Sequence, residues 1–163
     1  MYRGVILREM AIFKTGNLFG VPKEEHIIVT TNSFIRKDVA LAMGRGAAKD
    51  LVDYLPGIDI VFGKIILDTC GHLGEYHLIM SGRYGAFQTK RHFKYGSDIS
   101  LIRRAVSKLR TLAEVNPKSI YNLNFPGIGY GGLRRNQVLP LLETLLPDTV
   151  TVWEFSTSNE MTF

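Results

Sequence analysis

The stretch that decides the fold is Phe125–Leu133, which reads FPGIGYGGL and places four glycines within nine residues. It directly follows the apolar run Ile120–Phe125, which is typical of a buried strand. Glycines in this position let backbone N–H groups approach a ligand closely and form a concave site for an anion. The stretch taken alone also fits an ordinary tight turn between a strand and a helix, so the surrounding sequence decides between the two.

Composition indicates one globular domain over residues 1–163, because 45% of the residues are hydrophobic and 21% are charged. A single cysteine, Cys70, excludes an internal disulfide framework and suits a reducing cytoplasm. No apolar run approaches the roughly 18 residues that span a bilayer, and the N-terminus lacks a signal-peptide layout. We therefore expect a soluble, cytoplasmic protein without a membrane partner, and a monomer.

The net charge of +5 and the pI near 9.4 favour polyanionic partners mildly. Nucleic acid is a candidate partner on this ground, although many proteins without such a role are as basic. The four histidines are scattered and Cys70 has no partner at a ligand spacing, so we expect no metal site.

Strands alternate with helices along the chain, which predicts an α/β domain with a central, largely parallel sheet. Strands are expected at Gly4–Phe13, Glu25–Thr31, Ile58–Asp68, Tyr76–Ser81, Ser119–Phe125 and Val150–Phe155. Helices are expected at Ala47–Leu55, Ile99–Ala113 and Asn136–Leu146, with Ser97 or Asp98 capping the second and Asn136 the third. Pro140 is tolerable in the last helix if it falls near the first turn.

Four stretches could converge on one crevice, because ligands of such sheets sit beyond the carboxyl ends of the strands. Three of them follow predicted strands: Thr31–Ser33, the loop Gly82–Tyr95 and Phe125–Leu133. The fourth, Gly44–Ala48, begins a helix. The segment Gly82–Gly96 has no clean periodicity and is basic and aromatic, which suggests a functional loop.

In this order, the stretches resemble those of a macrodomain, the ADP-ribose-binding α/β/α module. The matching stretches are Thr15–Phe19, Val29–Asn32, Met43–Ala48 and Pro126–Leu133. The resemblance covers nearly the whole chain. It implies a three-layer α/β/α fold with a central mixed, largely parallel sheet, and ADP-ribose as ligand or product with no separate cofactor.

The resemblance also implies ligand-binding residues. Diphosphate binding is carried over to Gly44, Arg45, Gly46 and Ala47 in the first loop, and closure over the phosphates and distal ribose to Gly127, Ile128, Gly129, Tyr130, Gly131 and Gly132 in the second. Asn32 corresponds to the residue that faces the ribose hydroxyls, and Asn17 stands where an Asp usually accepts from the adenine amino group. Phe155 either contacts adenine or is an ordinary apolar residue at a strand end.

Within the family, Gln88–Phe93 and the residues from Lys37 to Gly46 are similar to a bacterial and phage branch. That branch includes antitoxin macrodomains that remove ADP-ribose from thymidine in DNA. The resemblance makes Lys90 the catalytic residue. A neutral amine could attack the anomeric carbon and form a transient Schiff base, whereas an ammonium could only bind phosphate.

The side chains expected to lower the pKa of Lys90 are Arg91 and Lys94, with Arg83 further back in the loop. A solvated basic loop without catalytic function is the alternative. His92 fits a packing role better than that of a base, and Asp38 fits a turn cap better than a catalytic carboxylate.

The leading hypothesis is therefore an ADP-ribose-binding macrodomain that hydrolyses ADP-ribosyl linkages, with nucleic acid as a candidate carrier. A non-catalytic reader or scavenger of ADP-ribose and a phosphatase for ADP-ribose 1″-phosphate remain alternatives within the same fold. A basic nucleic-acid-binding module without a nucleotide pocket is the alternative outside it. The second glycine loop lacks the carboxylate that hydrolases of a related branch carry there, so the chemistry has to come from elsewhere.

Overall fold

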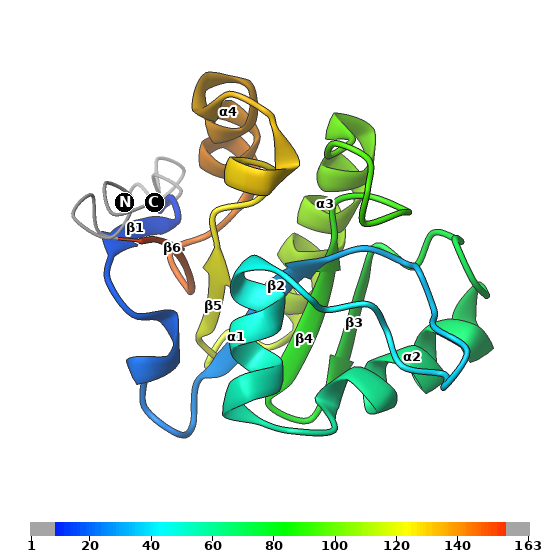
Figure 1. The fold of residues 1–163 in the computed structure, drawn as a ribbon. Coiled ribbons are helices and arrows are strands. Elements are labelled where there is room, and N and C mark those ends of the chain that lie inside the picture. Colours follow the sequence, from blue (N-terminus) through cyan, green and yellow to red (C-terminus); the bar gives the residue numbers. More distant parts are fainter. Residues whose placement is uncertain (1–8, 156–163) are drawn as a thin grey trace, which may run out of the picture.

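A six-stranded mixed sheet forms the centre of the computed structural model, which describes residues 9–155 (Figure 1). The strands are β1 (Ile12–Thr15), β2 (His26–Thr31), β3 (Leu78–Ser81), β4 (Tyr84–Gln88), β5 (Tyr121–Asn124) and β6 (Val150–Glu154). Their order across the sheet is β1-β6-β5-β2-β4-β3. All neighbouring pairs are parallel except β3 and β4, so five strands place their carboxyl ends at one edge.

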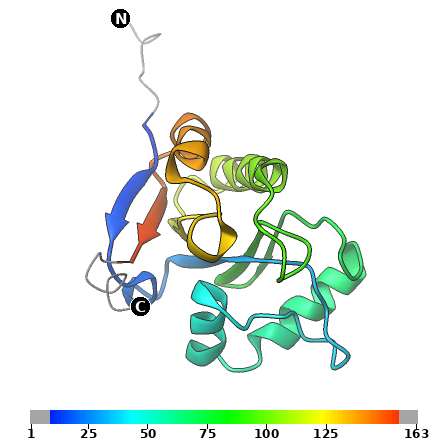
Figure 2. The ribbon, with the colours of Figure 1, turned by 45° about the horizontal axis from the view of Figure 1, so that its top comes forward.

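Helices cover both faces of this sheet and make the three layers that the sequence predicts (Figure 2). The α-helices are α1 (Gly46–Tyr54), α2 (Ile58–Thr69), α3 (Ile99–Val115) and α4 (Arg135–Leu145), and the short 3-10 helices are η1 (Leu18–Gly20) and η2 (Gly129–Gly131). Helices α1 and α2 pack on one face, and α3 and α4 pack on the other. The fold class is therefore three-layer α/β/α with a mostly parallel sheet.

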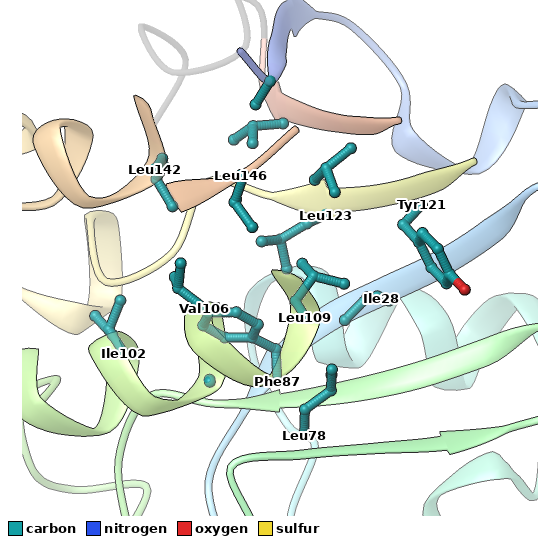
Figure 3. Packing of buried hydrophobic residues seen from close by; sticks show 14 of the residues in the cluster. Ile28, Leu78, Phe87, Ile102, Val106, Leu109, Tyr121, Leu123, Leu142 and Leu146 are labelled. Carbon is teal, nitrogen blue, oxygen red and sulfur yellow. The ribbon is translucent and has the colours of Figure 1, made fainter. Parts of the chain in front are cut away.

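Successive side chains of the central strand β2 point to opposite faces of the sheet, so this strand contributes to both layers of the core. Ile28 points toward α3 and α4, whereas its neighbours Ile27 and Val29 point toward α1 and α2, and all three are fully buried. On the α3 side, Leu109 of the helix packs with Phe87 and Ile28 of the sheet (Figure 3). A strand buried on both faces reads as a continuous apolar run, which explains why this one is visible in the sequence.

The prediction of a strand at Ile58–Asp68 was wrong, because this segment is helix α2. Gly57 adopts a left-handed conformation with φ of 96° and lets one helix follow another directly. Ile58, Phe62 and Ile66 recur every four residues and are buried on one face. The β-branched residues of the segment hid this helical period, and packing overrode their strand propensity.

The segment Gly82–Gly96 is only partly a loop, because its residues Tyr84–Gln88 form β4 between β2 and β3. The lack of periodicity suggested a loop, but Gly85 lies in the strand, where a Cβ atom would lie 2.4 Å from Met80 Sδ and 3.0 Å from Ile28 Cγ1. The glycine therefore serves close packing within the sheet rather than a turn.

The other predicted elements are confirmed with shifted ends. The first strand runs over Ile12–Thr15 rather than Gly4–Phe13, and residues 4–8 of the prediction lie outside the described residues. Asp98 caps α3 by accepting a hydrogen bond from Ser100 N at 2.8 Å. Helix α4 begins at Arg135 rather than at an Asn136 cap, so Pro140 lies in its second turn and not its first.

Candidate functional site

The first glycine loop leads into α1 at the carboxyl edge of the sheet. Arg45 is the N-cap residue, and its side chain makes no capping hydrogen bond. Within residues 9–155, the amides of Gly46, Ala47 and Ala48 donate to no acceptor, and Lys49 N is the first to bond back into the helix, to Arg45 O at 3.2 Å. Free amides at a helix N-terminus, together with the helix dipole, favour an anion here.

The second glycine loop presents a comparable set of amides. Gly127, Gly129 and Gly132 have φ values of 84°, 66° and 78°, and Leu133 N donates to Gly127 O at 2.9 Å, which closes the loop. The consecutive amides from Ile128 to Tyr130 donate to no acceptor in the part of the chain that the structure describes. Successive backbone N–H groups exposed in a tight turn form an anion-binding concavity.

The two glycine loops contact each other. The Arg45 guanidinium lies 5.3 Å from the centre of the Tyr130 ring, and a Cβ atom at Gly46 would lie 3.9 Å from Tyr130 Cδ2. Tyr130 itself is 68% exposed. The two loops therefore lie next to each other at the carboxyl edge of the sheet.

Lys90 lies two residues beyond the carboxyl end of β4, and its side chain is half-buried. Burial and the charge of Arg45 together hold the pKa of Lys90 below the ordinary lysine value of 10.5. The segment that carries Lys90 also contacts the second glycine loop, because Ser97 N donates to Gly131 O at 2.7 Å. Lys90 therefore lies within electrostatic reach of Arg45 in the first loop, and the segment that follows it reaches the second loop.

The charges expected to act on Lys90 are not the ones that the structure brings there. Arg83 lies at the amino end of β4, where its guanidinium donates to Glu25 O at 2.7 Å and Pro22 O at 3.0 Å. The five residues of β4 lie between it and Lys90 and alone span about 16 Å. Arg91 is paired with Glu75 instead. The cation that lowers the pKa is Arg45, which the sequence analysis assigned only to phosphate binding.

The two asparagines that the resemblance implies as ligand-binding residues, Asn32 and Asn17, both form hydrogen bonds with backbone groups. Asn32 is buried, its Nδ2 donates to Ala42 O at 2.9 Å, and its Oδ1 accepts from Phe34 N at 2.8 Å. Asn17 caps η1, because its Oδ1 accepts from Phe19 N at 2.9 Å. An amide side chain can make four hydrogen bonds, so each still has capacity for a ligand.

A shallow pocket, open to solvent, lies where β1, β5 and β6 end. Its lining residues are Gly16, Leu18, Phe19, Ala47, Asn124, Trp153, Glu154 and Phe155. Ala47 belongs to the first glycine loop, so the pocket adjoins the free amides of α1. Its wall is mostly apolar and includes aromatic side chains, against which a nucleobase can stack.

Sequence reasoning missed three of these lining residues, Asn124, Trp153 and Glu154. Asn124 binds β2 through both ends of its amide, accepting from Thr30 N and donating to Thr30 Oγ1, each at 2.9 Å. Trp153 Nε1 donates to Asn122 Oδ1 at 2.9 Å. Their place at the carboxyl ends of β5 and β6 was the available signal.

The two weaker candidates have structural contacts. Asp38 pairs with Arg36 at 2.8 Å and accepts from Ala40 N at 3.3 Å, which is the role of a turn cap. The His92 ring packs against Phe34 and Phe93 with ring centres 4.8 and 4.5 Å away, and its Nδ1 accepts from Lys94 N. Both contacts agree with the structural interpretation of these residues.

Residues 9–155 contain no group of three or more histidine, cysteine or acidic side chains arranged to hold a metal ion. Among the described helices, none has the length and apolar character needed to cross a membrane.

The mixed sheet, its helical layers and the two glycine loops make a macrodomain fold, and solved macrodomain structures are similar to it. The macrodomain of Thermus aquaticus DarG is 20% identical with a TM-score of 0.69, over 91% of this chain and 99% of that one. The macrodomain of Mycobacterium tuberculosis DarG is 18% identical with a TM-score of 0.68, over the same shares. Likeness at this identity establishes the fold.

A third similar structure is Thermosipho africanus DarTG in complex with ADP-ribose. It is 20% identical with a TM-score of 0.66, over 88% of this chain and 40% of that longer chain. No protein-family model matches the sequence, and no curated protein matches it.

Proposed function

We propose that this chain binds ADP-ribose across its two glycine loops and hydrolyses ADP-ribosyl linkages with Lys90 as the nucleophile. The observation that carries the proposal is a half-buried lysine whose pKa is lowered by burial and by Arg45, at the same edge of the sheet as two loops of unpaired amides. A lysine acts as a nucleophile only when neutral, so burial and a neighbouring cation favour that role.

The proposed binding mode follows the order of features along the carboxyl edge of the sheet. Adenine occupies the pocket that Phe155 and Trp153 line. The diphosphate lies on the amides of Gly46–Ala48 and Ile128–Tyr130, and the distal ribose reaches Lys90. The complex of the similar Thermosipho africanus DarTG with ADP-ribose supports this choice of ligand.

The chemistry that we propose needs no cofactor. The lone pair of Lys90 Nζ forms a bond to the anomeric carbon of the distal ribose, and the bond from that carbon to the attached group breaks. The attached group leaves with the electron pair and takes the proton that the amine loses. Opening of the ribose ring gives a Schiff base, and water hydrolyses it to release ADP-ribose and the free amine.

We further propose nucleic acid as the carrier of the ADP-ribose. The similarity of Gln88–Phe93 to macrodomains that act on thymidine in DNA supports this carrier, as does the net charge of +5. The likeness to two DarG macrodomains is in keeping with it.

The first testable prediction is that Lys90→Ala abolishes turnover without abolishing binding. On a single-stranded oligonucleotide that carries ADP-ribose on thymidine, we expect a loss of at least a hundredfold, because the nucleophile is gone. The affinity for ADP-ribose, measured by calorimetry, should change less than tenfold. Lys94→Ala is the matched control, since it removes an exposed cation from the same segment. Wild-type turnover by Lys90→Ala would refute the role of this lysine.

A non-catalytic reader of ADP-ribose is the second candidate. The observation that favours it is the sequence Gly129–Leu133 of the second loop, which carries no carboxylate to assist a leaving group. Tight binding of ADP-ribose by the wild-type chain, with no product from ADP-ribosylated DNA and no phosphate from ADP-ribose 1″-phosphate, would establish the reader.

A further inference from the structure

Gln88 is a buried polar side chain that the proposed binding mode and chemistry do not use. It is the last residue of β4 and is fully buried. Its Oε1 accepts from Tyr76 N at 2.9 Å and from His77 N at 3.0 Å. Its Nε2 lies 2.9 Å from Gly74 O and 3.3 Å from Lys90 O. Only one orientation of the amide satisfies donors on one side and acceptors on the other.

Ser33 completes this arrangement from the neighbouring strand. It lies two residues beyond the end of β2, is fully buried, and its Oγ lies 3.2 Å from Gln88 Nε2. Ser33 N donates to Arg91 O at 3.0 Å, and Ser33 Oγ donates to the same oxygen at 3.3 Å. The carbonyl groups of Lys90 and Arg91 are therefore both held from inside the protein.

The rest of the segment is bonded in the same way. Thr89 N donates to Thr31 O at 2.9 Å, and Thr89 O accepts from Asp98 N at 2.8 Å. The backbone from Thr89 to Arg91 thus continues the line of β4 past the point where the strand ends. A lysine has four rotatable bonds, so fixing its backbone decides which positions its amine can reach.

We infer that Gln88 and Ser33 are positioning residues for Lys90, whose buried side chains fix the backbone from which the amine reaches the distal ribose. The inference rests on the function proposed for Lys90. Neither side chain contacts the ligand in the proposed binding mode. Misplacing a reacting group by about 1 Å can cost on the order of a hundredfold in rate, so a small shift of this backbone is sufficient to matter.

The test compares two variants with a control at the other end of the same strand. Ser33→Ala removes the hydroxyl but keeps the backbone bond to Arg91, and Gln88→Met removes every bond of the amide at similar size. Arg83→Met is the matched control, because it removes donors to backbone carbonyls at the amino end of β4. Ser33→Ala keeps the test usable if Gln88→Met does not fold.

Two readouts are measured on the full chain. The first is the single-turnover rate on the ADP-ribosylated oligonucleotide, with the calorimetric affinity for ADP-ribose beside it. We expect the rate to fall about tenfold in Ser33→Ala and about a hundredfold in Gln88→Met, with affinity changed less than threefold. Arg83→Met should keep the wild-type rate.

The second readout does not depend on turnover. After reductive methylation with ¹³C-formaldehyde, the NMR signal of Lys90, assigned with Lys90→Arg, reports its titration. The charged group that acts on Lys90 is Arg45, from the turn into α1, whereas the neighbouring Arg91 is paired with Glu75. In Ser33→Ala the Lys90 signal should titrate closer to the ordinary lysine range, because the side chain gains access to water.

The outcomes separate the inference from the proposed function. The inference would be overturned if folded Ser33→Ala and Gln88→Met both kept the wild-type titration of Lys90 and the wild-type single-turnover rate. An inactive wild-type chain whose Lys90 titration moves in Ser33→Ala but not in Arg83→Met would contradict the proposed function and support the positioning role.

Discussion

Arg45 has more contacts at the site than its place in a phosphate loop implies. It lies over the Tyr130 ring, and its charge lowers the pKa of Lys90. The amine is therefore neutral over a wider range of pH than an ordinary lysine would be. A residue that binds phosphate and also influences the nucleophile would link ligand binding to reactivity.

This arrangement predicts the pH dependence of turnover. Because only the neutral amine attacks, the single-turnover rate should rise with pH and level off above the pKa of Lys90. Replacing Arg45→Gln removes a neighbouring positive charge and raises that pKa toward the ordinary value, so the rising limb should move to higher pH. Lys94→Gln is the control with an equal loss of charge. A rising limb unchanged by Arg45→Gln would contradict the electrostatic role.

At the residue scale, sequence patterns indicated candidate residues but not their partners. The glycine patterns pointed to both loops, and the resemblance to macrodomains pointed to Lys90. The cations that act on Lys90 were wrongly predicted: Arg91 is paired with Glu75, and Arg83 lies at the far end of β4. Arg45 is distant in the chain but close to Lys90 in space. Distances across a sheet depend on strand register, which residue spacing does not give.

The second glycine loop shows how one element combines packing with ligand geometry. Gly127 has a positive φ, and a Cβ atom there would lie 2.7 Å from Ile102 Cδ1 on α3. Gly129 also has a positive φ, but no atom lies within 4 Å of its Cβ position. One glycine therefore fixes the loop to the core, while the other serves only its conformation.

The comparison of Gly127→Ala with Gly129→Ala separates these two effects. Both variants pay roughly 1–2 kcal/mol for a left-handed non-glycine residue. Gly127→Ala should cost about 1–3 kcal/mol more, because it overpacks the contact with Ile102. Urea denaturation of both variants measures the difference. Equal destabilisation would show that the loop does not press on α3.

Helix α2 gives a second test at this scale. Gly63 lies inside it, and a Cβ atom there would lie 1.8 Å from Val39 O and 2.9 Å from Leu41 N. Helix propensity alone predicts that Gly63→Ala stabilises the chain by about 1 kcal/mol. The structure predicts the opposite sign, a loss of more than about 2 kcal/mol, because backbone atoms have to move.

Thermal denaturation of Gly63→Ala beside Lys64→Ala, its exposed neighbour on α2, measures this effect. A stabilised Gly63→Ala would contradict the packing of α2 against the segment at Val39. Helix α2 itself was predicted as a strand, because its β-branched residues are common in both buried strands and buried helices. Elements with a clear stripe, such as α3, and strands buried on both faces, such as β2, were predicted correctly.

The whole molecule places all candidate segments at one edge because five strands run parallel. The pocket at Phe155, the two glycine loops and Lys90 come from residues far apart in the sequence and follow one another along that edge. The alternation of strands and helices predicts such an edge, since ligands of open α/β sheets bind there. The missed strand β4 did not change this conclusion, because Lys90 follows it directly.

Binding across this edge should stabilise the whole fold. At a concentration of ADP-ribose a hundredfold above Kd, the free energy of unfolding should rise by about 2.7 kcal/mol. For a domain of this size the melting temperature should then rise by about 5–10 °C. Gly44→Asp should remove most of this shift, because its carboxylate repels the diphosphate. The side chain itself fits, since no atom lies within 4 Å of a Cβ atom built at Gly44. An unchanged shift in Gly44→Asp would place the diphosphate elsewhere.

The central claim is that Lys90 forms a covalent bond to the ribose, and reductive trapping tests it most directly. The wild-type chain is incubated with the ADP-ribosylated oligonucleotide and sodium cyanoborohydride, and its peptides are analysed by mass spectrometry. We predict an ADP-ribosyl adduct on Lys90 and no adduct in Lys90→Arg. Turnover without an adduct on Lys90, or an equal yield of adduct in Lys90→Arg, would contradict the mechanism.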